Sequence, residues 1–212
     1  PQIDLNKELA KLNKEGIGII TILDNDYPKL LKEIYDAPAI MYIKGALKPE
    51  DEFAIAVVGT RKLSTYGQQV TSQISRELAQ AGLTIVSGLA LGVDTLAHLA
   101  ALEQKKRTIA VLGSSIDRFN IFPPQNRSLA EKIAQDGAVL SEYPIGAPAL
   151  AHHFPNRNRI VSGLPLGTLV VEAPEKSGAI ITANHALAQN REVFAVPGSI
   201  FSNNSIGPNN LI

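Results

Sequence analysis

The sequence predicts an α/β fold: a doubly wound, mostly parallel sheet with a small N-terminal α+β extension. Two observations support this prediction. From residue 53 onward, six short apolar runs alternate with longer amphipathic segments, and the runs are rich in Val, Ile and Leu without the period-2 alternation of half-exposed strands. Such runs are typical of parallel strands covered on both faces. Regular strand–helix alternation is typical of a doubly wound sheet.

The elements of the main sheet follow in order from this pattern. The strands are expected at Ala54–Val58, Leu83–Val86, Thr108–Leu112, Ala138–Leu140, Thr168–Val171 and Val193–Val196. The helices are expected at Tyr66–Ala81, Thr95–Gln104, Ser128–Gln135 and Ala179–Gln189. Gly82 follows the first helix where a C-terminal cap belongs, and Ser177 precedes the last one as an N-cap. Pro155 suits the first turn of a further helix.

The first 48 residues have a different character and are predicted to form a separate extension. Their expected elements are a helix at Asp4–Asn13, a strand at Gly18–Ile22, a helix at Pro28–Tyr35 and a strand at Ile40–Ile43. Because two strands cannot form an independent core, we expect this extension (residues 1–48) to dock on the sheet of the main domain (residues 49–212) or to extend its edge. The tail 202–212 is rich in Asn, Ser, Gly and Pro, which predicts a loop.

Composition excludes several classes of protein. The 212 residues include no cysteine, which excludes disulfide scaffolds, thiolate chemistry and cysteine-ligated metal sites and fits a cytoplasmic location. No apolar run is long enough to span a bilayer, so we expect a soluble chain, trimmed from a longer protein, with no membrane partner. Twenty basic and twenty acidic residues balance, but residues 54–212 carry thirteen bases and ten acids. This excess leaves room for one basic pocket that binds a phosphate.

Small polar residues follow several of the predicted strands. In an open parallel sheet, ligands bind beyond the carboxyl ends of the strands, where helix N-termini offer free N–H groups. The residues expected at this edge include Gly59, Thr60, Arg61, Ser64, Ser87, Gly88, Ser177 and Gly178. A glycine or serine after one strand usually only makes a tight turn. Several such loops together with the guanidinium of Arg61 predict a site for an anion or a nucleotide-like ligand.

The segment Phe154–Arg159 adds two arginines, two asparagines and an aromatic ring. At a helix start these side chains and the free N–H groups would present a dense array of donors, and the ring could stack on a base. The alternative is a helix start with solvated arginines and a phenylalanine that belongs to the core. The sequence leaves both interpretations open.

Several enzymatic signatures are absent from the sequence. It contains no Gly-x-x-x-x-Gly-Lys-Ser/Thr loop, no Gly-x-Gly-x-x-Gly after the first strand of the main sheet and no His-Glu-x-x-His motif. Asp94 and His98 stand four residues apart, which favours a local hydrogen-bonded pair over a metal site. Glu142 and Glu172 each follow a strand; without a nucleophile beside them, a structural role is favoured over a paired acid and base. We therefore expect no catalytic residue, metal or cofactor.

The polar motifs stand in a definite succession along the chain. They are Gly59-Thr60-Arg61 with Ser64, Ser87–Asp94, Ala110–Gly113, Phe122-Pro123 with Asn126, Ser141–Pro144, Phe154–Leu164, Val171–Ala173, Ser177-Gly178 and Val193–Gly198. In this order they resemble the DNA-processing protein A family, also called DprA or Smf. The resemblance covers about residues 17–212, and the succession is specific although each motif alone is weak.

The resemblance implies an extended Rossmann-like domain that binds single-stranded DNA, self-associates as a homodimer and helps to load the RecA recombinase during natural transformation, without enzymatic activity. Arg61 would clamp a backbone phosphate beside the amides of Gly59 and Thr60. The DNA-binding residues that it implies, with Arg157, Asn158 and Arg159 as a basic wall and Phe154 against a base, are Gly59, Thr60, Arg61, Ser64, Ser87, Gly88, Phe154, Arg157, Asn158, Arg159, Ser177 and Gly178.

Two other functions remain open at this point. A Rossmann-type nucleotide-monophosphate phosphoribohydrolase would use an acid such as Glu172, but those enzymes carry a Pro-Gly-Gly-x-Gly-Thr loop. The nearest string here is Pro197-Gly198-Ser199, which lacks the key glycines. A scaffold that only dimerises would leave all of the loops as ordinary turns.

Overall fold

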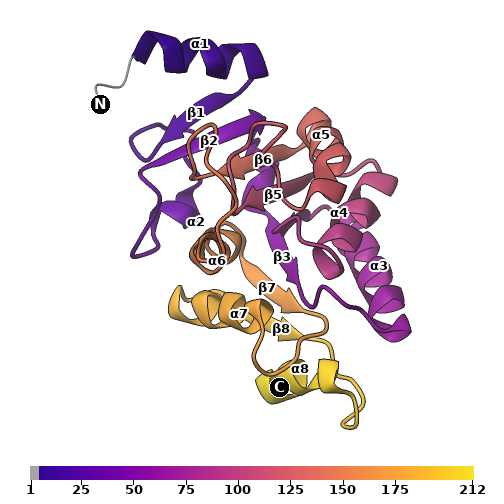
Figure 1. Ribbon diagram of the computed structural model, residues 1–212. Coiled ribbons are helices and arrows are strands. Elements are labelled where there is room, and N and C mark those ends of the chain that lie inside the picture. Colours follow the sequence, from indigo (N-terminus) through magenta and orange to yellow (C-terminus); the bar gives the residue numbers. More distant parts are fainter. Residues whose placement is uncertain (1–4) are drawn as a thin grey trace.

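Eight strands form one sheet in residues 5–212, the part of the chain that the computed structural model describes (Figure 1). The strands are β1 (Gly18–Thr21), β2 (Ile40–Gly45), β3 (Ala54–Val58), β4 (Thr84–Ser87), β5 (Thr108–Leu112), β6 (Ala138–Ser141), β7 (Gly167–Val170) and β8 (Glu192–Ala195). Their spatial order is β1-β2-β6-β5-β4-β3-β7-β8. All six predicted strands of the main sheet are present, with ends within one residue of the expected ones.

The six strands β3 to β8 are parallel to one another, which confirms the predicted doubly wound sheet. The chain runs outward from β3 through β4 and β5 to β6, and then returns to place β7 on the other side of β3. The strand order therefore reverses between β3 and β7. In open α/β sheets this switch point is where ligands bind, at the carboxyl ends of the strands.

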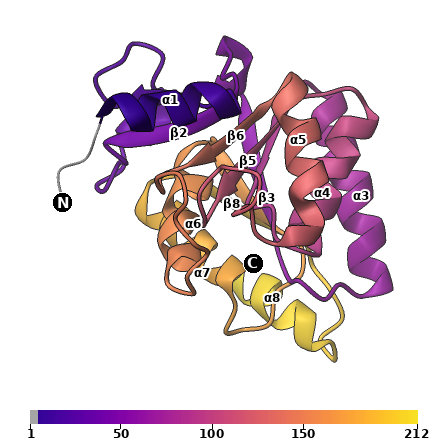
Figure 2. The same ribbon diagram turned by 45° about the horizontal axis from the view of Figure 1, so that its top comes forward.

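Helices cover both faces of the sheet. They are α1 (Leu5–Glu15), α2 (Lys29–Lys32), α3 (Thr65–Gln80), α4 (Val93–Glu103), α5 (Arg127–Asp136), α6 (His153–Gly163), α7 (Gly178–Ala188) and α8 (Ile206–Leu211). Figures 1 and 2 show α3, α4 and α5 on one face and α6 and α7 on the other. Within residues 5–212, none of the helices combines the length and apolar composition that crossing a bilayer requires.

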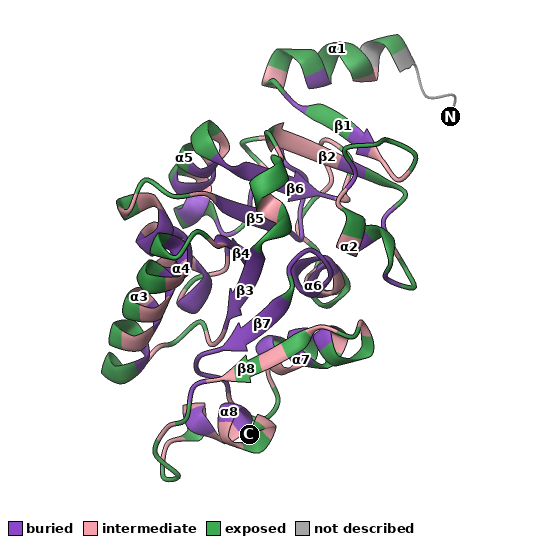
Figure 3. Cartoon of the chain, turned by 180° about the vertical axis from the view of Figure 1, so that it is seen from behind, coloured by how far each residue is buried: buried purple, intermediate pink, exposed green. Residues whose placement is uncertain are grey.

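Alternate residues of each central strand enter the two cores. In β3, Ile55 and Val57 pack with residues of α3 and α4, whereas Ala56 and Val58 pack with residues of α6 and α7. Every residue of β3 is buried, and Figure 3 shows the same for its neighbours, while β8 at the edge is partly exposed. Burial on both faces explains why these strands are continuous apolar runs in the sequence.

The N-terminal extension lengthens the main sheet at its β6 edge. β1 and β2 form an antiparallel hairpin, and β2 pairs with β6, also antiparallel, with Tyr42 opposite Ser141. This confirms the second of the two predicted arrangements. Leu31 and Met41 of the extension are fully buried in the core that also contains Val161 of α6. The division into residues 1–48 and 49–212 stays a prediction.

Two N-terminal helices differ in extent from the predictions. The expected helix 28–35 is only the single turn α2, and residues 33–36 form turns and a bend instead of continuing it. α1 continues two residues beyond the expected end and stops at Gly16, whose φ is +65°. The predicted start of α1 at Asp4 lies outside the described residues.

The prediction of a loop for the tail 202–212 is wrong. Residues Asn203–Ser205 form a 3-10 turn that leads into α8. Tertiary contacts hold this segment: Ala173 donates its N–H to Asn204 O at 2.7 Å, and Gly207 donates its N–H to Ala173 O at 2.9 Å. Asn209 bonds both the N–H and the carbonyl of Gly198 at 3.0 Å. These contacts stabilise a helix that its Asn, Gly and Pro content would not form alone.

Candidate functional site

A cleft of about 820 Å³ opens at the carboxyl edge of the sheet, beside the switch point between β3 and β7. Its walls come from the loops after β3, β4 and β7, from the starts of α6 and α7, and from the C-terminal segment at Asn203 and Asn204. Of the twelve predicted site residues, nine line the cleft: Gly59, Thr60, Arg61, Gly88, Phe154, Arg157, Asn158, Ser177 and Gly178. The predicted edge therefore does bring residues from distant loops together.

The loop after β3 carries two exposed cations, Arg61 and Lys62. Neither forms an ion pair with any residue that the structure describes. The guanidinium carbon of Arg61 lies 5.9 Å from the ring centroid of Phe154, within reach of a cation–π contact. Gly59 lets this loop approach its neighbours, because a Cβ there would lie 2.8 Å from Glu172 O. A free guanidinium and an aromatic ring thus stand side by side in the cleft.

Contrary to the expectation from the sequence, the N–H of Thr60 is not free to bind a phosphate. Thr60 donates its N–H to Glu172 O at 2.6 Å, so this N–H is already used inside the protein. The free amides at this edge belong instead to the first turn of α7, since the initial N–H groups of a helix have no partner within the helix. Ser177 caps α7, with its Oγ accepting from the N–H of Ile180 at 3.4 Å, and Gly178 and Ala179 line the cleft. This helix N-terminus favours an anion.

Arg157 lines the cleft but is itself buried, with 5% of its surface exposed. Its guanidinium donates to Gly88 O at 2.7 Å and to Val111 O. Burial lowers the pKa of Arg157 to about 10, and the nearby carboxylate of Asp94 opposes this shift. Burial likewise raises the pKa of Asp94, and Arg157 opposes it. Arg157 therefore holds the strand-end loops together, and Arg61 is the more accessible of the two guanidinium groups.

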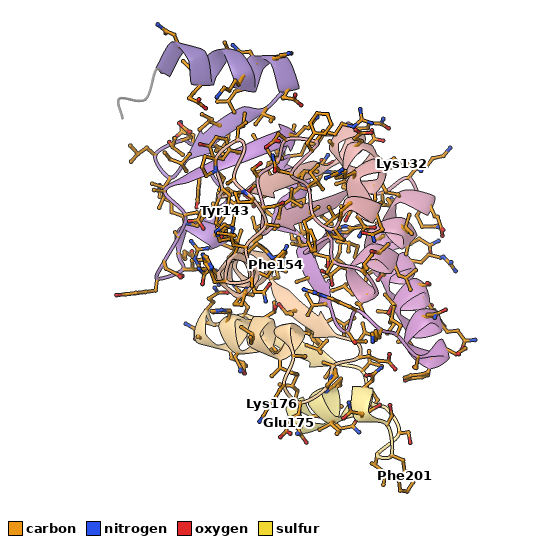
Figure 4. All side chains as sticks on the ribbon, viewed as in Figure 1. Lys132, Tyr143, Phe154, Glu175, Lys176 and Phe201 are labelled. Atoms are coloured by element: carbon orange, nitrogen blue, oxygen red, sulfur yellow. The ribbon has the colours of Figure 1, made fainter. Side chains whose placement is uncertain are left out.

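Asn158 and Phe154 occupy the first turns of α6. Asn158 donates from Nδ2 to Gly178 O at 3.1 Å, which ties the start of α6 to the start of α7. Phe154 is partly exposed, and its ring lies 5.6 Å from that of Phe122. Figure 4 shows Phe154 near the middle of the molecule, with Glu175 and Lys176 of the loop before α7 below it in the view. The interpretation of Phe154 as an ordinary core residue is thus not supported.

Three predicted site residues lie outside the lining of the cleft. Ser64 caps α3: its Oγ accepts from the N–H of Gly67 at 3.0 Å. Ser87 is fully buried and donates to Val57 O at 2.7 Å. Arg159 points into a separate pocket, where it pairs with Glu142 at 2.7 Å and Asp36 at 2.9 Å. Arg159 is therefore not part of one basic wall with Arg157, and a DNA contact for these three residues stays a prediction.

The two strand-end glutamates have the structural roles that the sequence favoured. Glu142 accepts from Arg159. Glu172 is 2% exposed and accepts from the N–H of Ser64 at 3.0 Å and from its hydroxyl at 2.5 Å. The prediction of an Asp94–His98 pair is wrong: His98 bonds Thr108 Oγ1 at 2.7 Å, while Asp94 accepts N–H groups of its own loop. No group of three metal-ligating side chains occurs among the described residues.

Sequence reasoning missed some residues of the cleft. Lys62 follows directly after Arg61, so its position in the same loop was a usable signal. Phe122 belongs to a motif that was noted without a role. Asn203 and Asn204 reach the cleft only because the tail folds back, and no sequence signal indicated that.

Together, fold and cleft define a Rossmann-like α/β protein whose cleft at the switch point of the sheet contains exposed cations and an aromatic ring. The family model described as DNA recombination-mediator protein A matches residues 18–212, and the chain belongs to this family. This confirms the resemblance that the succession of motifs indicated.

Relatives agree with this assignment over nearly the whole chain. The chain is 44% identical to the DNA processing protein DprA of Bacillus subtilis over 209 residues, which are 98% of this chain and 70% of that protein. It is 47% identical to the protein Smf of Synechocystis over 195 residues, 90% of this chain and 48% of that protein. The chain thus spans 70% of the length of the first relative and about half of the length of the second.

Two solved structures share the fold. The X-ray structure of DNA processing protein A from Streptococcus pneumoniae superposes with a TM-score of 0.88 at 43% identity, covering 95% of this chain and 71% of that one. A structure of DNA processing protein A from Helicobacter pylori, described for its single-stranded DNA binding mode, gives a TM-score of 0.82 at 34% identity, covering 92% of this chain and 86% of that one. The predicted extended Rossmann-like fold is confirmed.

Proposed function

We propose that this chain binds single-stranded DNA in the cleft at the switch point and acts as a recombination mediator, not as an enzyme. The observation that carries the proposal is the position of Arg61, exposed, without an ion pair among the described residues, and 5.9 Å from the ring of Phe154. One nucleotide offers a phosphate to the first group and a base to the second. The single-stranded DNA bound by the Helicobacter pylori relative supports this choice of ligand.

In this proposal, Arg61, Lys62 and the first amides of α7 hold phosphates, and Phe154 stacks on a base. A charged groove combined with an aromatic ring is the usual arrangement for binding single strands without sequence preference. Stacking requires a base that is not paired, so the same arrangement favours a single strand over a duplex.

The Arg61 test measures binding of a labelled oligo-dT by fluorescence anisotropy at several salt concentrations. Arg61→Ala should weaken binding roughly tenfold or more, because a charge-assisted hydrogen bond is lost. The slope of log affinity against log salt should fall by about 0.7, the value for one phosphate contact on a single strand. Arg76→Ala, an exposed arginine on α3 outside the cleft, is the matched control and should bind as the unaltered chain does. Equal affinity for Arg61→Ala and Arg76→Ala would contradict the proposal.

We further infer that the protein works in the cytoplasm as a homodimer and helps to load RecA recombinase onto single strands during natural transformation. The description of the family as recombination mediators supports this part of the proposal. The unaltered chain should speed RecA assembly on a strand covered by single-strand binding protein, and Arg61→Ala should not. Sedimentation should give twice the chain mass of 22.7 kDa. A monomer at all concentrations would contradict the homodimer.

The phosphoribohydrolase alternative is not favoured. Its acid would be Glu172, but this carboxylate is buried, is hydrogen-bonded to Ser64 and does not line the cleft. Incubation with AMP should release no free base; release that Glu172→Gln abolishes would revive this alternative.

A further inference from the structure

The two exposed cations of the cleft stand on one short loop, residues 59–64, which leads from β3 to α3 (the Arg61 loop). Both ends of this loop are fixed by Glu172. The N–H of Thr60 donates to the backbone oxygen of Glu172 at 2.6 Å, and the N–H of Ser64 donates to its carboxylate at 3.0 Å. The cations lie between these ends, and neither forms an ion pair with a described residue. Their positions therefore depend on the backbone of the loop.

The middle of the Arg61 loop is held from outside by Asn204 of the C-terminal segment. The carbonyl of Lys62 accepts from Nδ2 of Asn204 at 3.0 Å and, within the loop, from the hydroxyl of Thr60 at 3.5 Å. The same Nδ2 also donates to Oε2 of Glu172 at 3.4 Å. The backbone oxygen of Asn204 accepts from the N–H of Ala173 at 2.7 Å. Asn204 thus joins the loop after β3 to the loop after β7, across the switch point of the sheet.

The side-chain amide of Asn204 is already used inside the protein. Its nitrogen carries two hydrogens, and Lys62 O and Glu172 Oε2 are two acceptors for them. The remaining polar atom, Oδ1, only accepts hydrogen bonds, and a phosphodiester group likewise offers only acceptor oxygens. Asn204 lines the cleft, but its chemistry suits it to hold the loop and not the strand.

We propose that Asn204 is a positioning residue of the phosphate site: it fixes the carbonyl of Lys62 and so holds the side chains of Arg61 and Lys62 in place for one strand. This inference rests on the proposed function and deepens it, because it makes the C-terminal segment part of the site. A loop that already has its bound conformation loses less conformational freedom when the ligand binds, so the affinity is higher. Without the Asn204 bond, the two cations spread over more conformations.

The experiment compares Asn204→Ala and Asn204→Leu, which removes the donor but keeps a side chain of similar size, with Asn210→Ala. Asn210 is an exposed asparagine of α8 that does not line the cleft. Binding of a labelled oligo-dT is measured by fluorescence anisotropy. Both Asn204 variants should bind roughly 3- to 10-fold more weakly, the range for one hydrogen bond, and Asn210→Ala should bind as the unaltered chain does.

Two further readouts separate positioning from a direct DNA contact and from general damage. In the Arg61→Ala/Lys62→Ala background, measured at low salt, Asn204→Ala should cause no further loss, because the bond then positions no cation. A direct contact with the strand would cause the same loss in both backgrounds. In the free protein, the amides of the Arg61 loop should exchange their hydrogens faster in both Asn204 variants, while the slow amides of β3 and β7 should exchange as in the unaltered chain.

The outcomes separate the positioning role from the proposed function. If the Asn204 variants bind as tightly as Asn210→Ala while Arg61→Ala binds more weakly, the positioning role is overturned and the function stands. An equal loss in both backgrounds also overturns it, in favour of a direct contact. If the unaltered chain binds no strand, both fail. Unchanged exchange in β3 and β7 shows that a variant is folded; if Asn204→Ala fails this check, Asn204→Leu decides the question.

Discussion

Two arginines of the same cleft have opposite environments. Arg61 is exposed at the end of β3, whereas the guanidinium of Arg157 is enclosed and donates to the carbonyls of two loops. A Cβ at Gly88 would lie 2.6 Å from Arg157 Nη2, so the glycine makes room for this guanidinium. The difference decides which residue is free for a ligand: Arg61 can bind a phosphate without breaking any contact within the described residues, and Arg157 cannot.

His98 is a neutral buried side chain whose tautomer follows from its neighbours. Thr108 Oγ1 donates its one hydrogen to Ile85 O at 2.7 Å, so His98 Nδ1 must donate to Thr108 Oγ1. Nε2 then carries a lone pair and has no hydrogen-bond partner among the described residues. Burial, with a smaller contribution from Arg157, lowers the pKa of His98 to about 3.

This shift predicts a loss of stability in acid. Below about pH 6.5 the unfolded chain takes up a proton on His98, which the folded chain does not take up until about pH 3, so stability falls as the pH falls through this window. Between pH 7 and pH 5 the free energy of unfolding should drop by about 2 kcal/mol more than in His98→Gln. Urea unfolding at the two pH values measures this, and parallel losses in both proteins would contradict it.

The site could be predicted from the sequence at the level of loops but not of individual side chains. Arg61 was found because the strand-end rule depends only on where a buried apolar run stops. The roles of Arg157 and Arg159 were not separable, because nothing in Asn-Arg-Asn-Arg indicates that one side chain turns inward to Gly88 and the other outward to Glu142. That choice depends on which loops the completed sheet brings next to α6.

At the scale of elements, the buried guanidinium of Arg157 joins α6 to the sheet, with the carboxylate of Asp94 nearby. Arg157 of α6 faces Asp94 at the start of α4 and bonds the end of β5 at Val111 and the loop after β4 at Gly88. Asp94 in turn accepts N–H groups of the loop after β4. The pair therefore positions two walls of the cleft at once.

Arg157→Met should lower the free energy of unfolding by about 3–5 kcal/mol, because it leaves the Asp94 carboxylate buried without a cation. Adding Asp94→Asn removes that charge and keeps an acceptor oxygen, so the double variant should recover about 1–3 kcal/mol of the loss. Urea unfolding of the two single variants and the double variant completes the cycle. Additive losses would show that the two side chains do not interact.

Element boundaries could be predicted where burial decides them and not where tertiary contacts do. The five strands β3–β7 were located within one residue because both of their faces are covered, which makes their sequences predominantly apolar. The edge strand β8 is partly exposed, and its position followed from the regular strand–helix alternation. The single turn α2 was overextended, and α8 was missed, because such short helices exist only through contacts with other segments. For α8 these are the bonds of Asn209 and Gly207 to distant backbone groups.

At the scale of the whole molecule, the N-terminal hairpin and the Rossmann-like sheet share one core. Met41 of β2 and Leu31 of α2 have no exposed surface, and they belong to the same cluster as Val161 and Leu164 of α6 and its C-terminal end. The helices approach so closely that a Cβ at Gly163 would lie 3.2 Å from Leu31 Cδ1. A hairpin that only docked on the surface would leave α6 with its own complete core.

The shared core predicts that the extension and the sheet unfold together. Met41→Ala should lower stability by about 2–5 kcal/mol, since it leaves a cavity in a fully buried position. Native-state hydrogen exchange should show this loss in the slowest amides of β4 and β5 as well as in β2, because a cooperative unit opens as a whole. Leu23→Ala, at a position 87% exposed in the same extension, is the control and should change stability by less than about 0.5 kcal/mol. If Met41→Ala speeds exchange in β1 and β2 alone, residues 1–48 form an independent folding unit. That outcome would contradict cooperative unfolding and agree with the domain boundary predicted from the sequence.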